Sequence, residues 1–86
     1  MSSNNMKKVY ILTCTNEEGR AVSAKVCLSK EEMQRRMRED YESEVEDAKS
    51  CGYEDYINGS IDSCGAWITY GSQSYTWDYF EDEIPV

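Results

Sequence analysis

The sequence predicts an α+β domain in which one long helix packs on one face of a mainly antiparallel sheet. Residues 30–50 carry apolar side chains at helical spacing, whereas the segments on either side alternate between apolar and polar residues, as strands do. Each flanking segment contains a turn signal that divides it into a hairpin. The predicted order is therefore ββαββ with four strands, or five if residues 56–62 add a short one.

The predicted helix has clear start and stop signals. Ser29 stands at the N-cap position with Glu32 three residues later, a spacing typical of a capping box. Gly52 is suited to the left-handed conformation that ends a helix, so we expect the helix to span residues 30–50. The residues that form its apolar stripe are Met33, Met37, Tyr41, Val45 and Ala48.

The segment before the helix predicts a hairpin. Residues 8–14 are apolar on both faces, which favours a strand that is covered or central in its sheet. Gly19 closes a turn, and residues 20–28 alternate in a second strand. Residues 1–7 are expected to form a disordered tail, and residues 8–86 a single domain. The side chains of the second strand that we expect to face the core are Val22, Ala24, Val26 and Leu28.

After the helix, Asn58-Gly59 favours a type I′ turn, and residues 65–70 and 75–81 favour the two strands of another hairpin. The acidic residues 81–83, together with Pro85, are expected to discourage further strand pairing. If Tyr75, Trp77 and Tyr79 face the helix, the opposite face is left uncovered. Such a face would form an apolar patch typical of partner or dimer surfaces. The residues expected on it are Val9, Ile11, Trp67, Thr69, Thr76 and Phe80.

Charge is distributed unevenly along the 86 residues, whose net charge is −8. Residues 1–38 contain eight Lys or Arg against four Asp or Glu, whereas residues 39–86 contain one Lys against thirteen acids. Nucleic acid as a direct partner is therefore unfavourable, as is an anionic membrane. A small basic group leaves direct contact with RNA or DNA open as a minor alternative. Its members are Lys7, Lys8, Arg35, Arg36 and Arg38.

Catalysis, metal binding and cofactors are not indicated. The chain has no histidine, and its four cysteines, at 14, 27, 51 and 64, form no CxxC pair. A zinc site would need all four cysteines from separate elements. Disulfides would need an oxidising compartment, and the apolar run near the start is too short for a signal peptide. We therefore expect reduced thiols in a cytoplasmic protein that is not an enzyme and binds no cofactor.

The acidic part of the helix and the aromatic residues that follow it suggest a binding surface. Carboxylates beside Tyr and Trp suit a surface that receives Arg and Lys side chains. The alternative is a solvated acidic face that only keeps the protein soluble. The residues that we predict to contact a partner are Glu39, Asp40, Glu42, Glu44, Glu46, Asp47, Trp67 and Phe80.

The stretch MKKVYILT, the acidic helix and the ending AWITYGSQSYTWDYFEDEI resemble small uncharacterised acidic proteins of phages and mobile elements of anaerobic Gram-positive bacteria. By analogy of size and charge, the resemblance implies an anti-defence role, similar to that of anti-CRISPR proteins, with a nuclease as partner. Three hypotheses follow: a non-enzymatic module that binds a basic protein surface, a module that dimerises through its open sheet face, and a small-molecule binder with an aromatic cleft.

Overall fold

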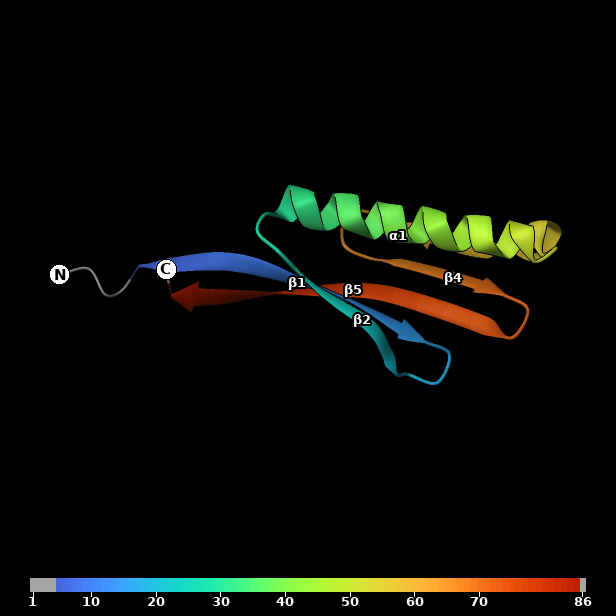
Figure 1. Ribbon diagram of the computed structural model, residues 1–86, viewed down its shortest axis with the longest axis horizontal. Coiled ribbons are helices and arrows are strands. Elements are labelled where there is room, and N and C mark those ends of the chain that lie inside the picture. Colours follow the sequence, from blue (N-terminus) through green and yellow to red (C-terminus); the bar gives the residue numbers. More distant parts are fainter. Residues whose placement is uncertain (1–4, 86) are drawn as a thin grey trace.

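The computed structural model describes residues 5–85 and confirms an α+β fold with one helix and an antiparallel sheet (Figure 1). The sheet has five strands in the spatial order β2-β1-β5-β4-β3. The first and last strands of the chain are therefore neighbours near its centre. The elements are β1 (Met6–Asn16), β2 (Ala21–Cys27), α1 (Lys30–Ser50), the 3₁₀ turn η1 (Glu54–Tyr56), β3 (Asn58–Ile61), β4 (Ala66–Tyr70) and β5 (Gln73–Pro85).

The helix has the predicted bounds and the predicted caps. The Ser29 hydroxyl accepts from the Glu32 amide at 3.0 Å, and the Glu32 carboxylate accepts from the amide of Leu28, one residue before the cap, at 2.8 Å. At the other end Gly52 has φ +88°, and the amides of Gly52 and Tyr53 bond back to the carbonyls of Lys49 and Ala48. This pattern is a Schellman motif, and it satisfies two carbonyls that the helix leaves open.

The core lies between the helix and one sheet face. Met33, Met37 and Ala48 of the predicted stripe are fully buried, while Tyr41 and Val45 are half-buried against them. The sheet contributes Leu12 and Cys14 from β1, Cys27 from β2, Ala66, Ile68 and Tyr70 from β4, and Trp77 from β5. Tyr75 and Tyr79 pack against this core, as predicted.

The predicted orientation of the second strand is wrong. Cys27 is fully buried, whereas Val22, Val26 and Leu28 are more than half exposed and Ala24 is also exposed. The face of β2 toward the helix instead carries Lys25, whose ammonium reaches the Asp40 carboxylate on α1 at 2.8 Å. The ion pair lets a lysine occupy a half-buried position, and the apolar residues are left on an open face.

Three further predictions, on two turns and on the end of the last strand, also differ from the structure. Asn58 and Gly59 lie inside β3, and the turn that follows β3 is formed by residues 62–65. Gly59 is needed for a close approach, because a Cβ there would lie 2.9 Å from the backbone oxygen of Trp67 and 2.6 Å from the Tyr41 hydroxyl. Residues 81–83 and Pro85 do not end the pairing, since β5 continues to Pro85 opposite Met6. The β4–β5 turn is shorter than predicted, with only residues 71–72 between the strands.

The paired ends of β1 and β5 extend beyond the start of the helix, toward both termini (Figure 1). Residues 6–9 pair with residues 82–85, whereas β2 joins β1 only from Tyr10 and β4 joins β5 only up to Trp77. We call this two-stranded projection the arm. Met6 and Lys7, which we expected in the tail, belong to it; residues 1–4 of that predicted tail lie outside the described residues. The molecule is consequently elongated, at 59 × 23 × 17 Å.

Candidate functional site

Glu39 and Asp40, the first two of the predicted acidic residues on the helix, have cationic partners. Glu39 accepts from the Arg35 guanidinium at 3.0 Å on the helix surface. Asp40 accepts from the Lys25 ammonium through both carboxylate oxygens, at 2.8 Å each. These two carboxylates are therefore less available to a partner than the sequence suggested.

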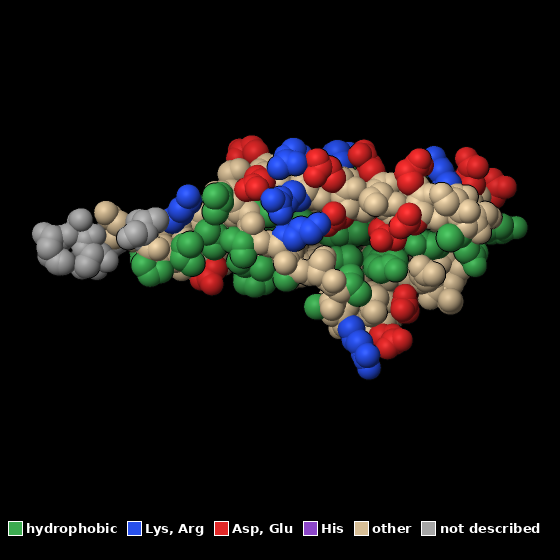
Figure 2. Space-filling view, in the orientation of Figure 1, with side chains coloured by type: hydrophobic (Ala, Val, Ile, Leu, Met, Phe, Trp, Pro, Cys, Tyr) green, Lys and Arg blue, Asp and Glu red, His purple; other side chains and the backbone are tan. Residues whose placement is uncertain are grey.

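The later acidic residues are more open. Glu42 and Asp47 are exposed and form no ion pair with any described residue. Glu46 is exposed, and its carboxylate lies 4.0 Å from the Lys49 ammonium, at the limit of an ion pair. Figure 2 shows blue and red side chains interspersed over the first half of the helix and mainly red ones over its second half. The unneutralised acidity thus lies at the C-terminal end of α1.

Glu44 faces inward and connects the helix to the sheet. Its carboxylate accepts from the hydroxyl of Tyr70, the last residue of β4, at 3.0 Å. Partial burial raises the pKa of Glu44, as do Asp47 and Asp40, whereas the hydrogen bond from Tyr70 lowers it. The pKa of Tyr70 is well above its ordinary value because the ring is buried and its hydroxyl faces Glu44. Tyr70 therefore stays protonated and keeps donating to Glu44.

A hollow of about 440 Å³ opens at this end of the molecule. It lies where the end of the helix, η1 and the β4–β5 turn meet. We call it the tyrosine hollow; its lining residues are Tyr53, Tyr56, Asn58, Thr69, Tyr70 and Gly71.

Two glycines shape the tyrosine hollow. Gly52 reverses the chain after the helix and brings Tyr53 back toward the sheet. Gly71 has φ +59° at the first position of the two-residue β4–β5 turn, which fits a type II′ turn. A Cβ on Gly71 would lie 3.0 Å from the Tyr53 ring, so glycine lets the ring lie directly against the turn.

The walls of the tyrosine hollow are aromatic and partly open to solvent. The rings of Tyr53 and Tyr70 lie 5.8 Å apart, and Tyr53 and Tyr56 are 37% and 69% exposed. Glu54 and Asp55, which stand between these two tyrosines in η1, are both exposed. Tyrosine faces beside carboxylates attract cations, both through the ring quadrupole and through charge.

Trp67 and Phe80 are not part of the same surface. Both are exposed, at 44% and 53%, but they lie on the sheet face away from the helix. The structure therefore does not bring them together with the predicted acidic residues. They are also separated from each other, because Trp67 pairs with Thr76 while Phe80 lies four residues further along β5.

Sequence reasoning did not single out Tyr53 and Tyr56 for the site. The signal that could have found them is local. The two tyrosines flank an acidic pair immediately after a helix-ending glycine, where a chain reversal leaves side chains exposed. Their juxtaposition with Tyr70 depends on the strand pairing and could not have been inferred from that signal.

A second hollow, of about 240 Å³, lies between α1 and the β1–β2 hairpin and is lined by Cys14, Lys25 and Asp40, among others. Burial, with the nearby Asp40 and Glu44, raises the pKa of Cys14 to about 11. Burial also raises the pKa of Cys27. Both thiols are therefore protonated near neutral pH and are weak nucleophiles.

Within residues 5–85, no group of three or more Cys, Asp or Glu side chains lies close enough together to hold a metal ion. In the same range, no helix combines the length and apolarity needed to cross a membrane. Comparison with protein-family models, with curated proteins and with solved structures finds no match to this chain.

Proposed function

We propose that the protein is a non-enzymatic acidic module that binds a basic surface of another protein. Its contact surface is the acidic end, which we define as Glu42, Glu46 and Asp47 on α1 together with the tyrosine hollow and the neighbouring Glu54 and Asp55. The observation that carries the proposal is the exposed tyrosine hollow together with exposed carboxylates, of which all but Glu46 have no cationic partner among the described residues.

The hollow and the carboxylates have different parts in this binding. An Arg or Lys side chain of the partner enters the hollow and lies against Tyr53 or Tyr56, a contact worth about 0.5–1 kcal/mol at an exposed site. The surrounding carboxylates raise the association rate by attracting the basic surface before contact. Because the carboxylates are exposed, salt weakens this attraction strongly.

The partner class follows from the resemblance to small acidic proteins of mobile elements. A nuclease of a defence system presents a basic groove for nucleic acid, and an acidic protein that occupies the groove competes with that nucleic acid. Inhibition of such a nuclease is accordingly the first activity to test.

The test begins with affinity capture at low and moderate salt, followed by titration of the purified captured protein with variants. Tyr56→Ala and the double variant Glu42→Lys/Asp47→Lys each alter the acidic end at exposed positions, so folding is preserved. The double variant Glu18→Lys/Glu31→Lys, with one change in the β1–β2 turn and one in the first turn of α1, makes the same charge change at exposed positions away from the site and is the matched control.

We expect Tyr56→Ala to weaken binding about two- to fivefold, as the loss of about 0.5–1 kcal/mol implies. We expect Glu42→Lys/Asp47→Lys to weaken it at least about tenfold, or about 1.4 kcal/mol. The control is expected to change binding less than about twofold at moderate salt. Equal effects of Glu42→Lys/Asp47→Lys and Glu18→Lys/Glu31→Lys would show that only net charge matters and would refute the assigned surface.

One observation favours a second function, the binding of a cationic small molecule in the tyrosine hollow. Its volume of about 440 Å³ lies within the range of roughly 300–1,000 Å³ that is usual for ligand pockets. A thermal-shift screen with guanidinium and quaternary ammonium compounds tests it. Stabilisation that is lost in Tyr56→Ala supports a small ligand, and no stabilisation by any of these compounds contradicts it.

A further inference from the structure

The sheet face away from the helix carries a group of apolar side chains at the arm. In the register of the sheet, Ile11 lies opposite both Val26 of β2 and Phe80 of β5. Val9 precedes Ile11 on the same face, and Ile84 lies diagonally beyond it in β5. We call this set, Val9, Ile11, Val26, Phe80 and Ile84, the apolar patch.

The apolar patch is separate from the main core. Val9 is only 1% exposed, yet it does not belong to the cluster that packs under the helix. Alternation along β1 places Val9 on the sheet face away from the helix, whereas Tyr10 and Leu12 lie on the face toward the helix. Around it, Val26, Phe80 and Ile84 remain 58%, 53% and 42% exposed. The patch thus has a buried centre and a broad apolar rim in contact with solvent.

The arm needs a further layer more than the rest of the sheet does. Residues 6–9 and 82–85 form only two strands, and they extend past the helix (Figure 1). A two-stranded ribbon in water is marginally stable without packing on one face. Figure 2 shows hydrophobic side chains gathered along this projecting end.

We propose that the apolar patch is the docking surface for a second copy of this chain. The charges at its edge are self-complementary. Lys7 and Asp82 lie on the same face as the patch, and neither forms an ion pair with a described residue. A two-fold axis through the patch brings Lys7 of each copy to Asp82 of the other, as an isologous interface requires.

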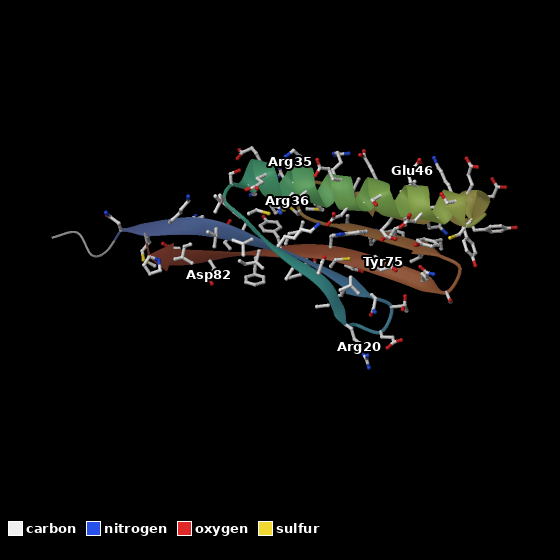
Figure 3. All side chains as sticks on the ribbon, in the orientation of Figure 1. Arg20, Arg35, Arg36, Glu46, Tyr75 and Asp82 are labelled. Atoms are coloured by element: carbon white, nitrogen blue, oxygen red, sulfur yellow. The ribbon has the colours of Figure 1, made fainter. Side chains whose placement is uncertain are left out.

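The position of the patch also favours a second copy over another partner. Two molecules of net charge −8 repel each other overall. At the arm, positive and negative side chains nearly balance, because Lys7 and Lys8 stand beside Glu81, Asp82 and Glu83. Arg35 and Arg36 lie on the neighbouring half of the helix (Figure 3). In a 59 Å molecule, docking through the arms keeps the acidic ends many Debye lengths of about 8 Å apart. The dimer therefore avoids most of the repulsion and leaves both acidic ends free.

The patch has only five side chains, far fewer than the roughly 20–30 residues per partner of a stable interface, so the equilibrium is a weak one. Sedimentation equilibrium of the full chain from about 1 μM to about 1 mM should show a reversible monomer–dimer transition in the micromolar range. A strictly monomeric protein at the highest concentration would overturn the proposal.

Exposed positions allow variants that preserve the fold. Phe80→Thr and Val26→Thr keep the β propensity of these positions but remove apolar surface from the rim of the patch. Each should raise the dissociation constant of the dimer at least about tenfold. Trp67→Thr removes a larger exposed ring from the same sheet face outside the patch and should change it less than about twofold. An equal loss in Trp67→Thr would overturn the assignment of the patch.

A charge swap tests the pairing between copies. Lys7→Glu should weaken association, because the new carboxylate of one copy then faces Asp82 of the other. Lys7→Glu/Asp82→Lys should restore it, with unchanged melting temperature of the monomer at low concentration. Failure of the double variant to recover would overturn the two-fold arrangement, whether or not the acidic end binds a basic protein.

Discussion

The hydrogen bond between Tyr70 and Glu44 should contribute measurably to stability, and Tyr70→Phe tests it. Tyr70 is only 4% exposed, and its hydroxyl donates to the Glu44 carboxylate at 3.0 Å. The substitution removes the hydroxyl and leaves the ring, so packing is almost unchanged. The loss is that of one hydrogen bond to a half-buried charged group.

A hydrogen bond to a charged group is worth about 1.5–3 kcal/mol. Water can partly replace Tyr70 at the half-exposed Glu44, so we expect a loss of about 1–2 kcal/mol in the free energy of unfolding. For a domain of this size, this corresponds to a fall of roughly 5–15 °C in melting temperature. Urea unfolding followed by tryptophan fluorescence measures the free energy directly.

Tyr75→Phe is the matched control. The Tyr75 hydroxyl has only an exposed contact of 3.4 Å to Gln73, so its removal should cost less than about 0.5 kcal/mol. Glu44→Ala and the double variant Tyr70→Phe/Glu44→Ala complete a cycle in which we expect a coupling of at least about 1 kcal/mol. A coupling near zero, or equal losses in Tyr70→Phe and Tyr75→Phe, would show that the hydrogen bond between Tyr70 and Glu44 does not stabilise the fold.

Three further predictions concern stability. Burial raises the pKa of Glu44 in the folded state, so its ionisation destabilises the fold as pH rises through that pKa. Glu44→Gln should remove this loss. In melting curves across pH, the variant should be more stable than wild type at pH 7 but not at pH 3. Trp77→Phe should have a free energy of unfolding in urea within about 1 kcal/mol of wild type, because it removes an Nε1 that is buried with no partner among the described residues. Trp77→Ala should lose about 3–5 kcal/mol. Similar losses in the two variants would contradict this prediction. Gly71→Ala should cost about 1–2 kcal/mol, because its φ is +59° and its Cβ would displace the Tyr53 ring, and an unchanged melting temperature would exclude this contact.

The helix was predictable because its signals are local. The Ser29 cap, the apolar stripe and Gly52 all lie within or next to the segment that they define, and the structure confirms bounds of Lys30–Ser50. An apolar stripe at helical spacing also indicates which face of the helix must pack against the sheet. The antiparallel sheet followed from alternation and turn residues for the same reason.

The facing of β2 could not be predicted in this way. Alternation divides the residues of a strand between two faces, but it does not show which face the helix covers. The apolar face belongs to the core only if it is the face under the helix. Here the pairing of Cys27 with Tyr10 sets the register, and Asp40 of the helix stabilises Lys25 on the covered side. Both determinants are tertiary. The length of β5 was missed similarly, since its acidic end is paired by β1 from the far end of the chain.

The candidate site was predictable in its chemistry and not in its place. Carboxylates and aromatic rings after residue 40 were predicted as the ingredients of a binding surface. Trp67 lies on the sheet face away from the helix, as predicted, and for that reason it does not join the carboxylates of the helix in one surface. Tyr53, Tyr56 and Tyr70 come together only because the chain reverses at Gly52 and β4 ends beside that reversal.

The separation of charge along the long axis gives the molecule an electric dipole. The helix carries arginines in its first half and carboxylates without ion-pair partners in its second half, so negative charge is concentrated toward one end of a particle 59 Å in length (Figures 2 and 3). In the field of a strongly cationic object such a particle rotates before it touches, and turns its negative pole forward. Each collision then begins from a favourable orientation, so fewer encounters are wasted than for a sphere with the same net charge spread evenly.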